Sequence, residues 1–253
     1  MNEGEWVRCS WDDDGVFSAV GKVDRVFPSG RRQVRFGNEI RNIPMERLVR
    51  QNKMQFLIDK SPKDVKRKAK SDFVGGQLLT PLTRYKNWQG VFAIDNGAFS
   101  HFHAEQFARL LERDHPLRSD CLFVTVPDVV GSARRTSELF EHRDRWVSDD
   151  WPIAYVAQDG AEDLPMPWGD MQALFIGGCD PWKDSKAAAD LVKTARTLGI
   201  HVHVGRVNTP ARFERFCDLD AQTCDGSGVA RYDHMLARIE SHFKTPRLLE
   251  VAE

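Results

Sequence analysis

The sequence predicts an α/β protein in which a TIM-like (β/α)8 barrel follows a small SH3-like or Tudor-like antiparallel β-barrel. Short alternating segments, broken by glycine and proline, fill the first part of the chain. From about Gln55 onward, continuous apolar runs alternate with amphipathic stretches, which is the pattern of parallel strands covered by helices. The length of 253 residues suits a barrel at the short end of its size range. We therefore place the β module at residues 1–52 and the barrel at residues 53–253.

The predicted β module rests on turn signals between its alternating segments. Asp14-Gly15, Pro28-Ser29-Gly30 and Gly37-Asn38 stand where hairpins need a positive φ angle or a preset proline. Modules of this kind bind nucleic acid, bind peptides or pack against a neighbouring domain, and the sequence leaves these three roles open. The expected strands are Trp6–Ser10, Val16–Val26, Arg32–Phe36 and Ile40–Pro44.

Seven apolar runs and a weaker eighth give the expected barrel strands, and the amphipathic stretches between them give the helices. A doubly wound open sheet is the alternative fold, but no G-x-G-x-x-G dinucleotide fingerprint follows a first strand. The expected strands are Gln55–Ile58, Val91–Ile94, Cys121–Val126, Ile153–Ala157, Ala173–Ile176, His201–Val204 and Leu219–Thr223, with the eighth within Gly75–Thr83. The expected helices are Ala104–Arg113, Ser132–Trp146, Lys183–Leu198, Pro210–Phe216 and Tyr232–Phe243.

The formal net charge of −1 argues against a nucleic-acid binder that acts through one large basic field. Positive charge is instead concentrated locally, between Lys60 and Lys70. This stretch is either a solvated helix face or a patch that contacts phosphates. Its basic residues are Lys60, Lys63, Lys66, Arg67, Lys68 and Lys70.

The compartment is expected to be the cytoplasm. No apolar run approaches the roughly 20 residues that a membrane-spanning helix needs, and the amino terminus carries no basic leader followed by an apolar stretch. The five cysteines are scattered, with no CxxC or CxC pair. This spacing predicts reduced thiols, no zinc and no other cofactor. The cysteines are Cys9, Cys121, Cys179, Cys217 and Cys224.

The residues that directly follow the expected barrel strands are unusually polar and rich in glycine. A barrel gathers these positions around one mouth, where active sites form. An aspartate after a strand commonly caps the next helix, but an ordered set of carboxylates at one concave mouth is typical of a catalytic site. The segments are Asp95 to Phe99 (DNGAF), Pro127-Asp128, Gln158 to Gly160 (QDG), Gly177-Gly178, Gly205-Arg206 and Asp225 to Gly228 (DGSG).

The order of these segments resembles the tRNA-guanine transglycosylase superfamily, from Asp95 to about Arg231. That family carries an Asp-Ser-Gly-Gly-Phe segment, an aspartate after the next strand, Gln-Gly and Gly-Gly segments, and a late nucleophilic aspartate. Here Asn96 replaces the serine and Gly97-Ala98 the glycine pair. Nothing after Asp225 supplies the zinc site of the tRNA enzymes. The chain is therefore more similar to the branch of phages and bacterial modification systems that inserts 7-deazaguanines into DNA.

The resemblance implies a guanine exchange by double displacement at a sugar carbon. It makes Asp225 the nucleophile, with Asp220 as a rival because the loop before Asp225 is of uncertain length, and it makes Asp95 the group that moves the proton of the leaving and incoming bases. Its implied base-binding residues are Asp128, Gln158, Gly177, Gly178, Phe99 and Asn96. Contacts to the nucleic-acid backbone are expected from Arg206, Arg231, Lys63, Lys66 and Arg67.

The expected substrates are nucleic acid, with DNA favoured over tRNA, and a preQ0-like 7-deazaguanine, and a partner protein that delivers the target is consistent with this reading. Three alternatives stay open. The same barrel could hydrolyse an N-glycosidic bond, because water can replace the incoming base. The chain could be a nucleic-acid-binding adaptor without catalysis. A metal-dependent hydrolase could recruit His101, His103, His201 and His203.

Overall fold

The computed structural model describes residues 6–12, 16–29, 31–36, 39–44, 48–50, 54–244 and 247–248. Two of the three predicted hairpin turns, at Asp14-Gly15 and Gly37-Asn38, lie outside these residues, as does Gly30 of the third. None of the helices within the described ranges is long and apolar enough to cross a membrane.

The N-terminal segments form an antiparallel sheet, as predicted. Its strands follow the order β4-β3-β2-β1-β5, and a short strand near the carboxyl terminus, β14 (Arg247–Leu248), also pairs with β2. Among the side chains of this sheet that the structure describes, Val23, Val34 and Ile43 are buried. The strands are β1 (Trp6–Asp12), β2 (Val16–Val26), β3 (Arg31–Phe36), β4 (Glu39–Pro44) and β5 (Leu48–Arg50).

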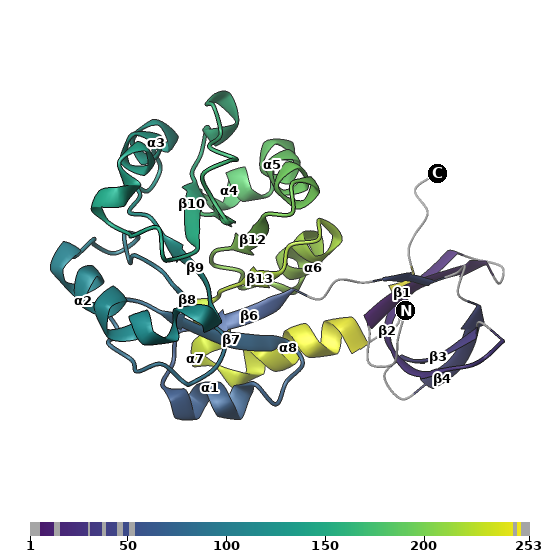
Figure 1. Cartoon of the computed structure of the whole chain (residues 1–253). Coiled ribbons are helices and arrows are strands. Elements are labelled where there is room, and N and C mark those ends of the chain that lie inside the picture. The colour runs from purple at the N-terminus through teal and green to yellow at the C-terminus, as the bar shows by residue number, and fades with distance from the viewer. Residues whose placement is uncertain are drawn as a thin grey trace.

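The remaining strands form a closed barrel of eight parallel strands, which confirms the predicted TIM-like fold. Figure 1 shows the strands at the centre with the helices arranged around them. Every strand pairs with its sequence neighbours, and β13 closes the ring by pairing with β6. The strands are β6 (Gln55–Ile58), β7 (Val74–Leu79), β8 (Phe92–Ile94), β9 (Cys121–Thr125), β10 (Ile153–Ala157), β11 (Ala173–Ile176), β12 (His201–Val204) and β13 (Thr223–Cys224).

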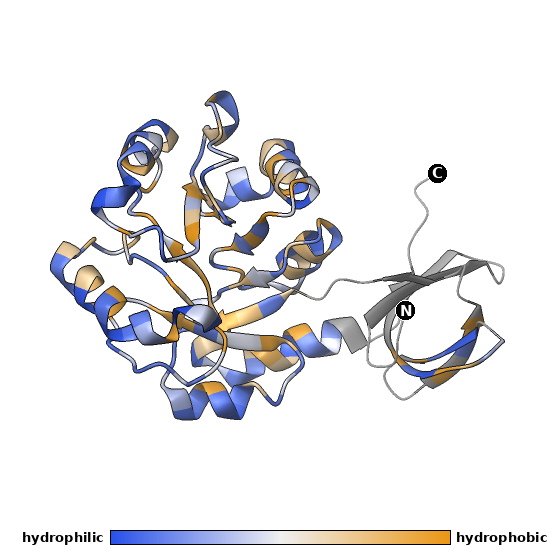
Figure 2. Ribbon diagram, viewed as in Figure 1, coloured by the Kyte–Doolittle hydropathy of each residue, from blue (hydrophilic) through white to orange (hydrophobic). Residues whose placement is uncertain are grey.

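The helices lie around the outside of the barrel, and hydrophobic residues alternate with hydrophilic ones along their ribbons (Figure 2). Their apolar residues include buried ones such as Leu110, Val192 and Phe213. Several helices begin at a side-chain cap: Ser61, Ser132, Ser185 and Thr209 each accept a backbone N–H of the first turn. The helices are α1 (Pro62–Lys68), α2 (Ala104–Asp114), α3 (Ala133–Glu141), α4 (Asp180–Lys183), α5 (Lys186–Thr197), α6 (Pro210–Asp218), α7 (Ser227–Arg231) and α8 (Asp233–Lys244), with short 3-10 turns at His115–Asp120, Arg143–Arg145 and Ala161–Asp163.

Three predicted elements differ from the structure by three residues or more at one boundary. The strand predicted at Leu219–Thr223 is wrong over most of its length, because α6 continues to Asp218 and the chain then turns through Asp220 in the left-handed region (φ 65°). The helix predicted at Lys183–Leu198 begins at Lys186, since Lys183 ends α4 and the Ser185 hydroxyl caps α5. The helix predicted to reach Trp146 ends at Glu141.

Apolar side chains fill two regions, as expected for a barrel. One cluster lies inside the ring and includes Leu57, Leu78, Phe123 and Phe175, while a larger one lies between strands and helices. Four cysteines, at 121, 179, 217 and 224, carry free thiols, and the Cys9 side chain lies outside the described residues.

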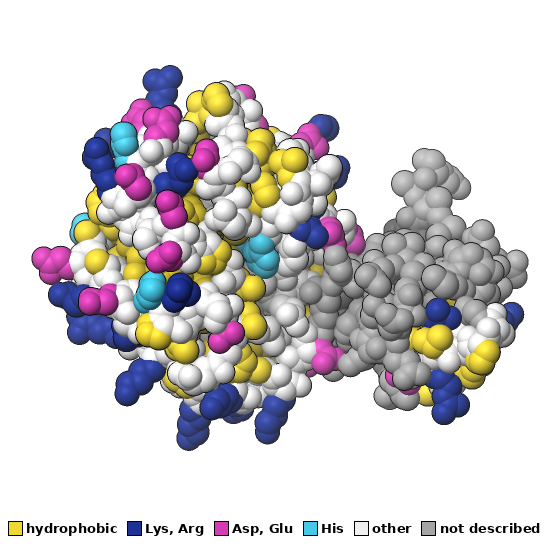
Figure 3. Space-filling model, viewed as in Figure 1, with side chains coloured by type: hydrophobic (Ala, Val, Ile, Leu, Met, Phe, Trp, Pro, Cys, Tyr) yellow, Lys and Arg dark blue, Asp and Glu magenta, His cyan; other side chains and the backbone are white. Residues whose placement is uncertain are grey.

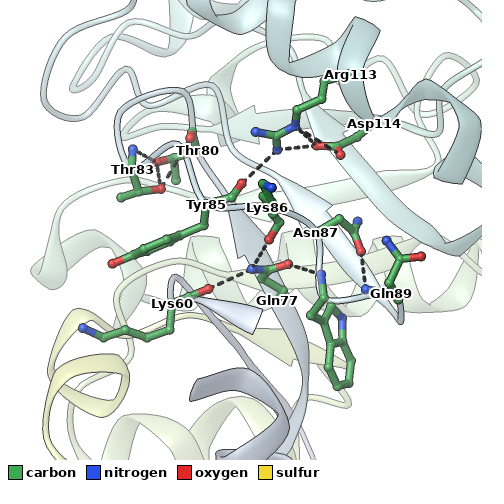
Figure 4. Close-up of polar contacts among 11 residues, drawn as sticks. Lys60, Gln77, Thr80, Thr83, Tyr85, Lys86, Asn87, Gln89, Arg113 and Asp114 are labelled. Carbon is green, nitrogen blue, oxygen red and sulfur yellow. Dashed lines mark hydrogen bonds and ion pairs between the residues drawn. The ribbon is translucent and has the colours of Figure 1, made fainter. Parts of the chain in front are cut away.

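Gln77 on β7 fixes the two loops that follow β6 and β7. Its amide nitrogen donates to the backbone oxygens of Lys60 and Lys86 at 2.8 and 2.9 Å, and its amide oxygen accepts the Trp88 N–H at 2.9 Å (Figure 4). The side chain is fully buried. Because no water competes there, these three bonds hold the loops against each other.

We expect Gln77→Leu to lower the free energy of unfolding by about 1–3 kcal/mol, because it leaves three partly buried backbone groups without their protein partner. Gln106→Leu on α2 is the control, since its amide makes no hydrogen bond with the described residues. Thermal and urea denaturation of both variants measure the difference. Equal stability of the two variants would contradict the role given to Gln77.

Candidate functional site

A cavity of about 610 Å³ opens at the carboxyl ends of the barrel strands. Every one of the eight strands contributes to its wall, either by a strand residue or by the loop that follows. The carboxylates at 59, 95, 128, 159 and 225 all reach it. Of the residues predicted from the sequence, the wall contains Asp95, Phe99, Asp128, Gln158, Gly177, Gly178, Arg206, Asp225 and Arg231.

Asp225 directly follows β13, and two nitrogen atoms lie within hydrogen-bond distance of its carboxylate. Its Oδ1 accepts the backbone N–H of Arg206 at 3.1 Å, and its Oδ2 lies 3.3 Å from Nε2 of His203. Its side chain is 16% exposed, so a substrate can reach it. The rival Asp220 precedes β13, lies at the opposite end of that strand and pairs with Arg196 at 3.0 Å. Asp225 is thus the one of the two that faces the cavity.

Asp95 follows β8 and accepts the Gly97 N–H at 2.8 Å. Desolvation in the barrel mouth raises its pKa to about 7, and repulsion from Asp225, Asp128 and Asp59 adds to the shift. A carboxyl with such a pKa exists in both protonation states near neutral pH. Asp95 can therefore act as a general acid and, once ionised, as a general base.

Asp128 follows β9 and is fixed by two side-chain amides. Asn96 donates to its Oδ1 at 3.0 Å, and Gln158 donates to its Oδ2 at 2.8 Å. Asn96 also donates to the Val126 oxygen, is buried and is not part of the cavity wall. The prediction of Asn96 as a base-binding residue is therefore replaced by a positioning role. Burial raises the pKa of Asp128, although both amides oppose the shift.

Gly177 and Gly178 lie in the wall after β11, but their backbone N–H groups do not point to a ligand. Both donate to the Ala157 oxygen, at 2.9 and 3.2 Å. Gly177 is needed for space, because a Cβ there would lie 2.7 Å from Val156 and 2.9 Å from the Gln158 amide nitrogen. Both N–H groups are thus already used within the protein. Gly177 makes room for Gln158, and Gly178 makes room for Trp182 and Asp159.

Asp59 is a site residue that the sequence analysis missed. It follows β6 as the other aspartates follow their strands, so the same rule could have found it. Desolvation raises its pKa, and the nearby Asp225 adds to the shift. Its Oδ1 is buried without a hydrogen-bond partner among the described residues. This oxygen is therefore ready to accept a hydrogen bond from a bound molecule.

Phe99 and Arg206 stand together at the rim of the cavity. The Phe99 side chain is 63% exposed, and the Arg206 guanidinium lies 4.2 Å from the centre of its ring. Arg206 has a positive φ of 62°. Phe99, which the resemblance implies as a base-binding residue, thus lies at the entrance of the cavity. There its ring and the Arg206 guanidinium can contact an aromatic or anionic substrate.

Three of the five basic residues predicted to contact the nucleic-acid backbone, Lys63, Lys66 and Arg67, lie on α1, on the outside of the barrel. Lys63 and Lys66 are exposed there, whereas Arg67 forms an ion pair with Asp233 at 2.8 Å. Figure 3 shows Lys and Arg side chains gathered over this region. The pairing of Arg67 leaves Lys63 and Lys66 as the more available charges of the predicted patch.

The four histidines of the metal-hydrolase alternative do not form one group. His101 and His103 contact each other in the loop after β8, while His201 and His203 lie inside the barrel. Among the described residues no group of three or more His, Cys, Asp or Glu side chains could hold a metal ion. The four histidines therefore give that alternative no ligand set.

Comparisons with known proteins give no family. No protein-family model matches the chain, and no curated protein matches it. The chemistry of the site is therefore argued from its own residues.

We expect Asp95→Asn to stabilise the protein at pH 8 more than at pH 5. The folded protein holds the Asp95 proton up to a pKa of about 7, whereas the ordinary value is 3.8. The folded state thus binds more protons between these values, and stability falls as pH rises through this window. Melting temperatures of both proteins at the two pH values test this, with the exposed Asp149→Asn as the control. A variant that is destabilised equally at both pH values would contradict the assignment.

Proposed function

We propose that the protein is a transglycosylase that exchanges guanine in nucleic acid for a 7-deazaguanine. The observation that carries the proposal is the meeting of Asp95, Asp128 and Asp225 at one cavity. These carboxyls come from three separate strands, and the cavity of about 610 Å³ is large enough for a nucleotide. The motif order that resembles the transglycosylase superfamily supports the same assignment.

In the first step an oxygen of Asp225 attacks C1′ of the target nucleotide. A C1′–O bond forms, the C1′–N9 bond breaks, and its electron pair goes to the guanine. Protonated Asp95 gives its proton to the leaving base, so guanine departs neutral. The pKa of about 7 makes this protonated form abundant near neutral pH.

The second step reverses the first with a different base. Ionised Asp95 takes the N9 proton of the incoming 7-deazaguanine, whose nitrogen attacks C1′ and releases the Asp225 carboxylate. The two displacements leave the sugar with its original configuration. Over the whole cycle one base is bound and one base is released, so the proposed reaction needs no cofactor.

Asp128 is the proposed reader of the base edge. A carboxylate accepts hydrogen bonds from the ring N–H and the amino group that guanine and 7-deazaguanine share. The amides of Asn96 and Gln158 fix the plane of this carboxylate before a base arrives. A base without those donors would leave the remaining acceptor positions of the buried carboxylate without a partner, which disfavours its binding.

DNA is the favoured polymer, and tRNA is the alternative. The target nucleotide must leave a duplex stack to reach the cavity. Arg206 and Arg231 at the mouth, with Lys63 and Lys66 on α1, are the proposed contacts to the phosphates on either side of it.

We expect Asp225→Asn to lower base exchange by at least about 10³-fold, because the nucleophile is lost. Asp220→Asn is the matched control and should keep the activity of the unmodified protein, since Asp220 pairs with Arg196 away from the cavity. The assay incubates DNA or tRNA with labelled preQ0-like base and measures label in the polymer.

The assay also separates the alternative functions. Release of guanine that leaves abasic sites without label would indicate a hydrolase. Binding of nucleic acid without either reaction, and unchanged in Asp225→Asn, would indicate an adaptor. Nucleoside analysis of host or phage DNA and tRNA, with and without this protein, then identifies the natural product.

A further inference from the structure

A chain of polar side chains leads from the barrel interior to Asp225. His201 Nε2 lies 2.8 Å from the Thr223 hydroxyl, and the same hydroxyl lies 2.9 Å from His203 Nδ1. His203 Nε2 then lies 3.3 Å from Asp225 Oδ2. His203 and Thr223 are paired residues on neighbouring strands β12 and β13, so the register of the barrel brings them together.

Both histidines lie in surroundings that favour the neutral ring. His203 is fully buried, with its ring centre 4.6 Å from that of Phe175 and 4.9 Å from that of Phe123. Burial lowers the pKa of His203, although Asp225 opposes the shift and Lys183 adds to it. Burial likewise lowers the pKa of His201 to about 3, helped by His203 and Arg196.

The direction of the hydrogen bonds follows from counting protons. A neutral His203 has one N–H, and the Asp225 carboxylate can only accept, so this hydrogen belongs on Nε2. His203 Nδ1 must then accept, and the single hydroxyl proton of Thr223 is its donor. The Thr223 oxygen is left to accept from His201 Nε2. With the reverse direction, His203 would carry its proton on Nδ1, and the lone pair of Nε2 would face the negatively charged Asp225 carboxylate.

We propose that His201, Thr223 and His203 form a directed hydrogen-bond relay that positions the Asp225 carboxylate for attack. The relay holds Oδ2, while the Arg206 backbone N–H holds Oδ1, so the carboxylate cannot rotate about its Cβ–Cγ bond. His203 is a positioning residue, because it acts on the substrate only through Asp225. The role given to Asp225 rests on the proposed function, whereas the tautomers of the two histidines do not depend on it.

The tautomers are measured first, by nitrogen-15 NMR of the full chain labelled at histidine. The relay predicts that His201 and His203 are both neutral near pH 7 and carry their proton on Nε2. Signals are assigned by their loss in His201→Gln and His203→Gln. A proton on Nδ1 of either ring, or a charged ring near pH 7, overturns the relay whatever reaction the protein performs.

Exchange kinetics then test the positioning. His203→Met removes the N–H that reaches Asp225, and Thr223→Val removes the donor that sets the His203 tautomer, while both keep similar bulk. Each should lower kcat about 10- to 100-fold with KM nearly unchanged, because the hydrogen bond to the charged Asp225 is lost or weakened. His203→Gln keeps an N–H near the place of Nε2 and should recover much of the lost rate. Melting temperatures show whether each variant folds.

Failure of the proposed function and failure of the hydrogen-bond relay can be told apart. Absence of base exchange in the unmodified protein would overturn the proposed function, while the tautomer measurement would still decide the relay. Exchange that is equally fast in folded His203→Gln and His203→Met would overturn the positioning role and leave the proposed function standing.

Discussion

The site depends on one constraint: the closed barrel forces carboxyl groups from separate strands into a single mouth that excludes much of the solvent. Desolvation and mutual repulsion raise the pKa of Asp59, Asp95 and Asp128. Such crowding costs stability, so a fold keeps it only where the groups are used. The parallel ring is what makes the crowding unavoidable, because all eight strands end at the same side.

The surrounding structure sorts these carboxyls into different chemical roles. Asp128 receives two amide donors, Asp225 receives a backbone N–H and a histidine contact, and Asp95 receives one backbone N–H. Each additional donor favours the ionised form of a carboxyl or fixes its plane. In the proposed reaction, this unequal support separates Asp128 as a fixed acceptor and Asp225 as a fixed nucleophile from Asp95, whose pKa of about 7 lets it exchange a proton.

The sequence predicts the strand ends well, because continuous apolar runs followed by polar residues mark them directly. Asp95, Asp128 and Asp225 could be placed at one mouth on that pattern alone. The roles of Asn96 and of the Gly177-Gly178 pair could not be predicted from the sequence. Asn96 bonds to Asp128 and the glycines bond to the Ala157 oxygen, and these partners come from neighbouring strands. The strand predicted at Leu219–Thr223 failed because α6 extends further than its apolar pattern indicated.

Binding of the free base tests most directly the claim that these carboxyls form a purine site. Isothermal titration of the full chain with 7-cyano-7-deazaguanine should give binding to a single site that guanine competes for. Asp128→Asn should weaken it about tenfold or more, because an acceptor for the base is lost, while Asp220→Asn should not change it. Absence of binding by either base, or equal binding by the Asp128→Asn protein, would contradict the account.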